Sequence, residues 1–454
     1  MISARKRIWG WYFFDWASQP YNTLLLTFIF APYFAEVARA HFMAGGAETE
    51  AAKAMAQTYW AGGLFVTGLL IAILSPVLGA IADGAGRKMV WIWSFSALYI
   101  VGSMMLWSTF PGMPSLIWPI FWFSLGFIGM EMATNFTNAL MPSLAPPEEL
   151  GKISGSGFAF GYAGGVLALI LVLFFFAQGE GTGKTFIGLS PLFGLDPATD
   201  QGTRAVGPFT AIWFAVFMIP FALWVKEPKP TGTRRNVRES LADLVQSVKD
   251  LRQRRSLGAF LLAAMFYRDS LNAIYGLGGA YASNAMGWSV VQSGSFGVLA
   301  AVTAAIFSWL GGRLDARLGP KVVVIWSILA LIVVVIVMVG LSPTSSFGVQ
   351  MADGSPIPDL VFYLCGAVIG AAGGIVQAAS RTLMVYHVTP ETAASGFGLY
   401  GLSGKATAFV GPGLVGAATY LSGSYRIGIS PLIGLFLLGL FLLLWVNPKG
   451  EKPL

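Results

Sequence analysis

Several ionisable side chains lie inside stretches that are otherwise apolar enough to cross a membrane. Among them are Asp15, Glu131, Arg268, Asp269, Arg381 and Lys405. Placing a charge inside a bilayer costs a few kcal/mol on insertion scales, so such groups are normally kept for a transport pathway, a coupling site or an internal ion pair. An ammonium group in a span could receive a substrate carboxylate, and a buried carboxylate could carry a proton. The residue types therefore indicate binding and proton-transfer chemistry.

Polar side chains accompany these charges at helical spacing. Asp15, Gln19 and Asn22 are spaced i, i+4, i+7 and share one face of a helix. Two further faces repeat the pattern: Glu131, Asn135 and Asn138; and Arg268, Asn272 and Tyr275. We predict that these faces line a polar cavity. The expected substrate-binding residues are Lys405, Asn22, Gln19, Arg268, Asn272, Tyr275 and Asn135, and the expected coupling residues are Glu131, Asp269 and Asp15.

Each charge also has a structural interpretation. Asp15 lies near the end of its span, where a contact with a helix terminus would explain it equally well. Arg268 and Asp269 could neutralise each other or pair with other helices. Arg381 is expected to be structural and to hold the end of a neighbouring helix. Lys405 and Glu131 are the strongest candidates for function.

The composition identifies the elements that must position these groups. Hydrophobic residues make up 56% of the chain and charged residues 11%, with a mean hydropathy of +0.69. These values are typical of a polytopic membrane protein. The net charge of +7 is explained by basic cytoplasmic loops and does not indicate a nucleic-acid partner. With one cysteine and two histidines, no metal site is expected, and nothing in the sequence points to a cofactor.

Twelve apolar stretches reach the length of a membrane-spanning helix, about 20 residues. We predict helices at 10–37, 58–82, 89–109, 115–140, 153–177, 208–226, 257–283, 290–312, 321–341, 358–386, 394–421 and 427–446. The basic N-terminal stretch is expected to precede a retained first helix, not a cleaved signal peptide. Placing both termini in the cytoplasm leaves few basic residues outside: Arg39, Lys53, Lys184, Arg204 and Arg426. The expected location is the inner, cytoplasmic membrane, and we expect a monomer.

Residues 227–256 switch to Pro, Thr and charged residues. We expect a cytoplasmic linker that contains a short amphipathic helix at about 237–254 on the membrane surface. It separates an N-terminal half, 1–226, from a C-terminal half, 257–454. A solvated connector is the simpler interpretation of its charge run, with a regulatory or protein-binding role as the alternative.

A motif occurs twice, about half the chain length apart. Its first copy contains Gly79, Asp83, Gly86, Arg87 and Lys88, and its second contains Gly311, Asp315 and Arg317. The glycines permit a tight turn and close backbone approach, and the aspartate could accept hydrogen bonds at a helix N-terminus. Two copies indicate a duplicated helical bundle. Other glycines recur at four-residue spacing, at 161 and 165 and at 366, 370 and 374, which predicts smooth faces for close helix packing.

Twelve helices in two like halves with this duplicated loop resemble the major facilitator superfamily of secondary transporters. Four segments make this resemblance more specific: Trp11–Ala17, Asn138–Gly165, Tyr267–Gly279 and Gln377–Thr407. The last of them contains a Leu-Ser-Gly-Lys-Ala-Thr run. These segments resemble the branch named for the yeast vacuolar amino-acid effluxer of autophagy, which has many bacterial members. The resemblance implies amino-acid export and places Asp15, Asn138, Asp269, Arg381 and Lys405 on family motif positions. Ser270 departs from the Gly expected there, and Arg268 receives no family role.

The sequence therefore predicts an all-α, twelve-helix secondary transporter with two pseudo-symmetric six-helix bundles. Its expected cargo is a small polar metabolite, with amino-acid export by alternating access, and proton coupling is plausible. One alternative is a drug or lipid exporter, against which the polar faces argue. Another is a transport-inactive scaffold or receptor, which would tolerate neutralisation of Lys405 and Glu131. An enzyme is not expected, since no nucleophile, metal cluster or paired catalytic carboxylates stand out.

Overall fold

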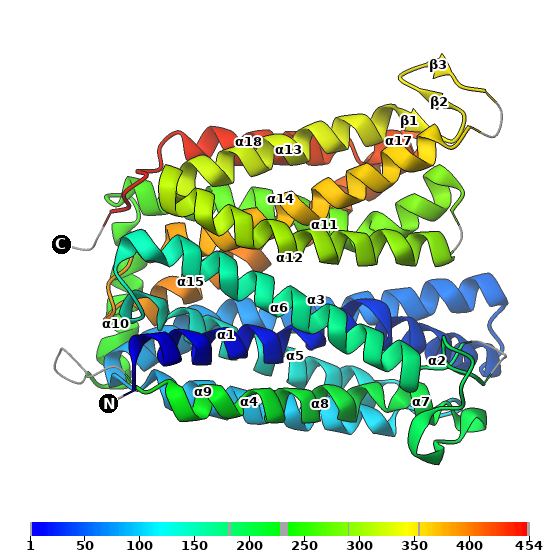
Figure 1. Cartoon of the computed structure of the whole chain (residues 1–454), viewed down its shortest axis with the longest axis horizontal. Helices are drawn as coiled ribbons and strands as arrows, with labels where there is room; N and C mark the ends of the chain where they lie inside the picture. The colour runs from blue at the N-terminus through cyan, green and yellow to red at the C-terminus, as the bar shows by residue number, and fades with distance from the viewer. Residues whose placement is uncertain (1, 180–182, 228–234, 289, 353–354, 452–454) are drawn as a thin grey trace. The chain divides into compact units, whose positions relative to one another are not determined.

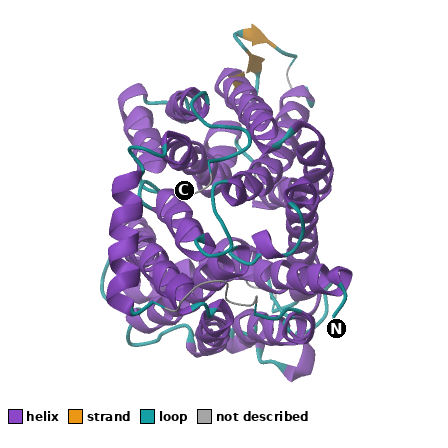
Figure 2. Cartoon of the chain, turned by 90° about the vertical axis from the view of Figure 1, so that its left-hand side faces the viewer, coloured by secondary structure: helices purple, strands orange, loops and turns teal. Residues whose placement is uncertain are grey.

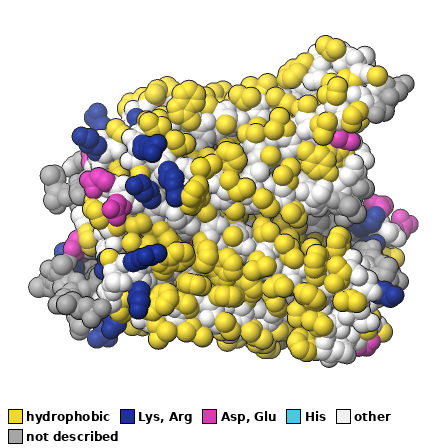
Figure 3. Space-filling view, in the orientation of Figure 1, with side chains coloured by type: hydrophobic (Ala, Val, Ile, Leu, Met, Phe, Trp, Pro, Cys, Tyr) yellow, Lys and Arg dark blue, Asp and Glu magenta, His cyan; other side chains and the backbone are white. Residues whose placement is uncertain are grey.

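The computed structural model describes residues 2–179, 183–227, 235–288, 290–352 and 355–451. Helices make up most of this part of the chain, as Figure 2 shows. The all-α fold class predicted from the sequence is confirmed. On the face drawn in Figure 3, hydrophobic side chains cover the helices along their length, while Lys and Arg gather near helix ends.

Ten helical stretches of the described chain are long and apolar enough to cross a membrane. Two further segments bring the number to the twelve expected. One is α11, Arg255–Met286, whose hydropathy is lowered by Arg268, Asp269 and Asn272. The other is the pair α15, Ala393–Lys405, and α16, Val410–Ser422, which the sequence pattern presented as one helix, 394–421. That single-helix expectation is wrong, and the break falls at Lys405.

The helices group into two compact units. Unit 1 comprises residues 1–71, 87–137 and 160–228, and unit 2 comprises 72–86, 138–159 and 229–454. Three helices each contribute residues to both units: α3 Thr49–Ala85, α5 Ile117–Asn138 and α6 Pro147–Phe175. Unit 2 therefore contains short segments from the N-terminal half of the chain, and one of them carries Gly79, Asp83 and Gly86 of the first motif copy.

Unit 1 is built around aromatic side chains. Tyr21 and Tyr99 are completely buried, and their rings lie 5.1 Å apart; the Tyr21 hydroxyl donates to the Phe123 carbonyl at 2.5 Å. Within this unit α8 packs on α4, and α9 packs on α1 (Figure 1). The elements that supply unit 1 residues are α1 Ala4–Pro20, η1 Tyr21–Phe28, α2 Phe30–Ala44, α3 Thr49–Ala85, α4 Lys88–Met105, η2 Leu106–Ser108, α5 Ile117–Asn138, α6 Pro147–Phe175, η4 Leu192–Gly194, η5 Pro197–Thr199, α7 Gln201–Arg204, α8 Val206–Phe217 and α9 Ile219–Trp224.

The first span changes its hydrogen bonding at Pro20. Because proline has no backbone N–H, the carbonyl of Trp16 loses its helical partner. The indole N–H of Trp213 donates to that carbonyl at 3.2 Å. Beyond Pro20 the chain forms the π-helix η1, which closes with an i to i−5 bond from Ile29 N–H to the Leu24 carbonyl at 3.0 Å. Such π segments often mark functional sites.

Unit 2 is organised around α11 and α14. α11 packs on α18 and α15, and α14 packs on α12 and α13. The small antiparallel sheet β1-β2-β3 follows α13, with Leu341 opposite Ser346 and Ser345 opposite Gln350. The elements that lie wholly in unit 2 are η3 Met141–Ser143, α10 Val237–Asp250, α11, α12 Val290–Leu318, α13 Pro320–Gly340, β1 Leu341–Ser342, β2 Ser345–Ser346, β3 Val349–Gln350, α14 Ile357–Tyr386, α15, α16, α17 Tyr425–Gly428 and α18 Pro431–Leu443.

Glycines bring α14 into close contact with α12. A Cβ at Gly370 would lie 2.0 Å from the Ala300 carbonyl oxygen, and one at Gly366 would lie 2.4 Å from the Phe296 ring. In unit 1, a Cβ at Gly165 would lie 2.5 Å from the Thr23 hydroxyl. The expectation that these glycines form smooth packing faces is confirmed.

We expect Gly370→Ala to destabilise the protein. The added methyl group would meet backbone at 2.0 Å, so α12 and α14 would have to separate, at a cost of about 1–3 kcal/mol. Thermal unfolding in detergent measures the effect. Gly434→Ala is the matched control, since a Cβ there meets no atom within 4 Å. Equal melting temperatures for the two variants would contradict close packing at Gly370.

Candidate functional site

The eleventh span is interrupted between α15 and α16. Pro412 has no N–H to donate to the Ala408 carbonyl, and the flanking Gly411 and Gly413 favour helix ends. In the break, backbone hydrogen bonds run to the residue three positions earlier instead of four. The Val410 N–H, for example, donates to the Thr407 carbonyl at 2.7 Å. Discontinuous helices of this kind build substrate and ion sites in secondary transporters, because half-helix ends supply unsatisfied backbone groups.

Asp269 of α11 lies at this break. Its Oδ2 accepts a hydrogen bond from the Gly411 N–H at 2.8 Å, and the side chain is 1% exposed. The carboxylate therefore occupies the positive N-terminal end of α16, which stabilises its charge. Its second oxygen, Oδ1, is buried and accepts no hydrogen bond from the residues that the structure describes. One carboxylate oxygen is thus satisfied and the other is available to a proton.

Arg268, the neighbour of Asp269, points to the last turns of α15. Its Nη1 donates to the Tyr400 carbonyl at 2.8 Å, and the guanidinium lies 4.2 Å from the centre of the Tyr400 ring. Gly404 makes room for it, since a Cβ there would lie 2.5 Å from the guanidinium carbon. Lys405 follows Gly404 directly and is the last residue of α15. Arg268 and Lys405 therefore bring two positive charges to the same end of this half-helix.

Asn272 and Tyr275 continue the face of α11 on which Arg268 lies. Both are exposed, Tyr275 to 41%, and its hydroxyl reaches the Gly373 position of α14. The structure therefore brings Arg268, Asn272 and Tyr275 onto one accessible face in unit 2, beside the end of α15.

In unit 1, the polar face of the first span meets α5. The Nδ2 of Asn22, in η1, lies 4.0 Å from the Met130 sulfur, and the Thr134 hydroxyl oxygen lies 3.8 Å from the same sulfur. Glu131 is adjacent to Met130 and half-buried. Gln19 packs against Gly165 of α6, and the backbone of Asp15 packs against Gly161. Asp15 and Asn135 are also half-buried.

The first copy of the repeated motif contacts the N-terminus of α15. Asp83 accepts from the N–H groups of Ala394 and Ser395 at 3.1 and 2.7 Å, and from the Ser395 hydroxyl at 2.9 Å. Gly79 permits the approach, since a Cβ there would lie 2.4 Å from the Ala394 carbonyl oxygen. Gly86, at φ +63°, makes the turn before Arg87. A carboxylate on two helical N–H groups is a strong, charge-assisted contact.

The second copy packs against the beginning of α6. Asp315 is 3% exposed, and a Cβ at Gly151 would lie 2.7 Å from its carboxylate carbon. Gly312 lies against the Gly151 carbonyl, while Gly311 packs on Ile375. Arg317 is exposed. Both copies therefore place an aspartate at the first turns of a helix from the other half of the chain, inside unit 2.

Arg381 links the ends of α6 and α14. Its Nε donates to Ser154 Oγ at 2.9 Å, its Nη2 to the Ser154 carbonyl at 2.8 Å and its Nη1 to Asn138 Oδ1 at 3.2 Å. Its guanidinium also lies 4.2 Å from the centre of the Phe158 ring. Asn138 and Arg381 each precede a Leu-Met pair by two residues, so equivalent positions of the two repeats meet here.

Glu227 caps the helix that begins at Lys88. Its carboxylate accepts hydrogen bonds from the backbone N–H groups of Lys88 and Met89 at 2.9 and 2.8 Å, at the N-terminus of α4. The Lys88 side chain itself is buried. Sequence reasoning missed Glu227, because a capping carboxylate so distant in the chain leaves no local pattern.

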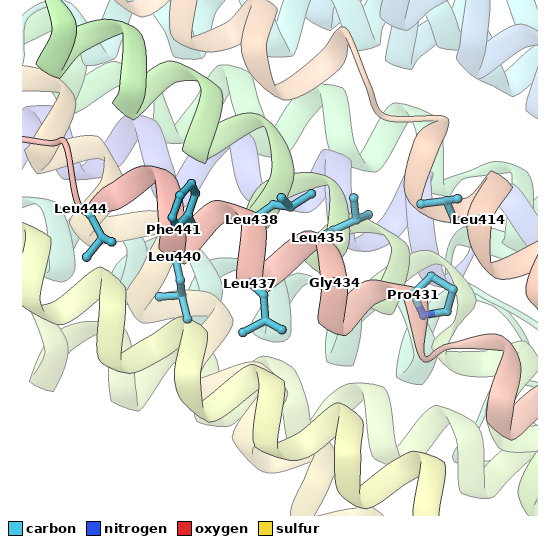
Figure 4. A pocket seen from close by; sticks show the side chains of 9 residues that line it. All are labelled: Leu414, Pro431, Gly434, Leu435, Leu437, Leu438, Leu440, Phe441 and Leu444. Atoms are coloured by element: carbon cyan, nitrogen blue, oxygen red, sulfur yellow. The ribbon is translucent and has the colours of Figure 1, made fainter.

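A groove of about 840 Å³ runs along α18 (Figure 4). It is lined by Leu414, Pro431, Gly434, Leu435, Leu437, Leu438, Leu440, Phe441 and Leu444. This apolar lining suits lipid chains and lacks the polar groups that would orient a polar substrate. Among the described residues, no three His, Cys, Asp or Glu side chains are arranged to hold a metal ion.

The broken span, its paired aspartate and the duplicated motif are features of transporters, and the comparisons agree. A family model described as "Vacuole effluxer Atg22 like" matches residues 3–452. The chain belongs to this family. It is a secondary transporter of the major facilitator superfamily and a multi-pass membrane protein, not an enzyme.

The relatives of this Atg22-like chain include a bacterial protein of similar length. The uncharacterized MFS-type transporter YxiO of Bacillus subtilis is 26% identical over 96% of this chain and 94% of its own. Autophagy-related protein 22 of Cryptococcus neoformans is 24% identical over 61% of this chain and 49% of its own. The crystal structure of the human organic anion transporter MFSD10 has a TM-score of 0.70 at 16% identity, covering 98% of this chain and 100% of that one. That similarity shows the major facilitator fold.

The break in the eleventh span of this Atg22-like chain had a signal in the sequence. Gly411, Pro412 and Gly413 interrupt the helical pattern six residues after Lys405. Pro20 likewise marks the π-helix of the first span. Pro20 follows Gln19, and Pro412 follows the break after Lys405. Irregular backbone in a membrane protein is tolerated only where it is buried in protein or lines a water-filled cavity.

Proposed function

We propose that this transporter exports amino acids, or closely similar small carboxylates, by alternating access of two six-helix halves, 1–226 and 257–454. The break of the eleventh span at Lys405 carries the proposal. An ammonium group and the Arg268 guanidinium stand at the end of a half-helix, and a substrate carboxylate needs such cations. The family description supports export, and the organic anion title of a structural neighbour supports an anionic group on the cargo.

Roles for the other polar residues follow from their placement. Asn272 and Tyr275 would supply hydrogen bonds on the accessible face of α11, and Gln19, Asn22 and Asn135 would do so in unit 1. Glu131, Asp269 and Asp15 are the proposed coupling carboxylates. Asp269 is favoured by its half-satisfied carboxylate. The motif contacts of Asp83, Asp315, Asn138 and Arg381 would hold one conformation of the transport cycle.

We further propose that the protein is a monomer in the cytoplasmic membrane with both termini in the cytoplasm. The excess of Lys and Arg in the segments that join even to odd spans supports this orientation. The ends of the helices that carry Asp83, Asp315 and Arg381 would then face the cytoplasm.

Counterflow in proteoliposomes tests the transport function. Vesicles loaded with one unlabelled amino acid should accumulate the same labelled amino acid transiently, and a panel of amino acids identifies the cargo. Lipids and amphipathic drugs form a second panel. Exchange of those compounds alone would favour the drug or lipid exporter, and no exchange by a folded protein would favour the scaffold.

Removal of the coupling carboxylates should separate exchange from accumulation. We expect Asp269→Asn or Glu131→Gln to keep counterflow at equal pH but to lose pH-gradient-driven accumulation, because an amide cannot carry the proton. Accumulation ratios measured with and without an imposed pH gradient give the result. Glu50→Gln, an exposed carboxylate paired with Lys53, is the control. If gradient-driven accumulation survives in Asp269→Asn, Glu131→Gln and Asp15→Asn alike, proton coupling by these groups is wrong.

A further inference from the structure

The chain after α18 returns to the first turn of α11. The Asn447 N–H donates to Ser256 Oγ at 2.8 Å, and the Ser256 N–H donates to Glu451 Oε2 at 3.0 Å. Arg254 donates from Nη2 to two carbonyls, that of Glu451 and that of His387, both at 2.7 Å. We call Arg254, Ser256, His387, Asn447 and Glu451 the tail clamp. It joins the end of the linker, α11, α14 and the C-terminal tail.

His387 lies at the centre of the tail clamp and is 0% exposed. Its Nδ1 is 2.8 Å from the Leu383 carbonyl, which can only accept, so Nδ1 carries the proton. Its Nε2 is 2.8 Å from Ser256 Oγ and accepts the hydroxyl proton. Ser256 therefore donates to His387 and accepts from the Asn447 N–H. Phe260 stacks on the imidazole with ring centres 5.6 Å apart.

A second proton on His387 would break this arrangement. Nε2 would become a donor, the Ser256 hydroxyl would have to turn away from it, and its proton would lose its acceptor in a buried place. The imidazolium would also lie beside the Arg254 guanidinium. Burial lowers the pKa of His387 from its ordinary value of 6.5, and Arg254 lowers it further, while the Leu383 carbonyl and Glu451 act against these effects.

The tail clamp is connected to the motif contact through a short connector. His387 is the C-cap of α14, and Ala394 and Ser395, seven and eight residues later, donate their N–H groups to Asp83. The turn between them is closed by the Thr392 N–H on the Thr389 carbonyl at 3.1 Å. The short connector therefore joins His387 directly to the N-terminus of α15, where Asp83 binds.

We propose that the C-terminal tail is a pH-sensitive clamp, in which protonation of His387 releases the tail and weakens the contact between Asp83 and α15. The proposal rests on the proposed orientation, which puts the tail clamp in the cytoplasm. Acidification of the cytoplasm would then free the transporter to change conformation more readily.

The charged groups that face His387 come from two elements. Arg254 comes from the end of the linker and Glu451 from the tail. Asp250 acts on Arg254 from α10. From α11, the uncharged Ser256 and Phe260 contact His387, and Tyr400 of α15 stacks on Phe260 at 5.8 Å. His387 is the group in this cluster with an ordinary pKa near neutral pH.

The sign of the effect follows from the lowered pKa of His387. The released state binds the proton at about the ordinary pKa and the clamped state only at a lower pH, so the clamp is fully formed above pH 6.5. Between these two pKa values, each pH unit shifts the clamped-to-released ratio toward release by up to about tenfold.

Hydrogen exchange of the full-length protein in lipid nanodiscs tests the clamp without a substrate. Protection of the Ser256 and Asn447 amides, corrected for the intrinsic pH dependence of exchange, is compared at pH 7.5 and pH 5.5. We expect protection of both to fall at pH 5.5, by up to about tenfold. The Ala394 and Ser395 amides, which Asp83 binds, should lose protection in the same pH range.

Two variants make the result decisive. His387→Gln can accept the Ser256 hydroxyl but cannot titrate, so its amides should stay protected at both pH values. Ser256→Ala removes both hydrogen bonds of the hydroxyl and should be released at pH 7.5, which preserves the test if His387→Gln fails to fold. Unchanged protection of Asn447 in the native protein at pH 5.5, or an unchanged pH response in His387→Gln, overturns the clamp. Release of Asn447 without loss of protection at Ser395 overturns its link to Asp83.

Discussion

Lys405→Gln is expected to remove the saturable amino-acid exchange of the native protein. Lys405 ends α15 at the break of the span, where its ammonium group would pair with the substrate carboxylate. Loss of one partner of a desolvated charge pair costs about 2–5 kcal/mol, so affinity should fall by about 30-fold or more. Counterflow measured over a range of substrate concentrations gives this change directly.

The chemistry of the substrate provides a second measurement of the same contact. The native protein should reject an amino-acid amide, which lacks the carboxylate, whereas Lys405→Gln should treat acid and amide nearly alike. Lys53→Gln, an exposed lysine at the start of α3, is the control. If Arg268→Gln loses this discrimination while Lys405→Gln keeps it, the carboxylate is bound by Arg268 and the assignment to Lys405 is wrong.

The spans could be predicted from the sequence because the bilayer imposes a simple rule. A helix that faces lipid must be apolar for about 20 residues, so its ends show where the apolar run stops. The stretch expected at 358–386 forms α14, Ile357–Tyr386. The stretch expected at 257–283 forms α11, although Arg268, Asp269 and Asn272 lower its hydropathy.

Interruptions inside spans were harder to predict than the spans. Pro412 breaks the eleventh span, but proline also occurs within continuous helices, as Pro76 does in α3. The difference lies in tertiary structure. The Asp269 carboxylate accepts a hydrogen bond from the Gly411 N–H, which the break leaves without a helical partner. Because Asp269 lies far from Gly411 in the chain, the local sequence does not indicate this contact.

Contacts between distant segments were predictable only in outline. Arg381 was expected to hold the end of a neighbouring helix, but the sequence did not indicate that it donates to Asn138. The tail clamp had no signal at all, because His387 and Glu451 are ordinary polar residues near helix ends. Pattern analysis finds periodicity, whereas these sites depend on which helix ends meet.

Arg381→Ala is expected to cause the largest loss of stability among single substitutions at the motif contacts. The guanidinium is 3% exposed and donates to Ser154 Oγ, the Ser154 carbonyl and Asn138 Oδ1. Its removal would leave buried acceptors without donors and an empty space beside the Phe158 ring, at a cost of at least about 3 kcal/mol. The apparent Tm in detergent should fall by about 5 °C or more.

The shape of the guanidinium, and not only its charge, should matter at Arg381. Arg381→Lys keeps the charge but cannot place donors on Ser154 and Asn138 together, nor lie flat on the Phe158 ring, so it should recover only part of the lost Tm. Arg238→Ala, on the exposed surface of α10, should leave the Tm unchanged. If the Arg381→Ala variant melts at the same Tm as the native protein, the link between α6 and α14 adds nothing to stability. Full recovery in Arg381→Lys would assign its contribution to charge alone.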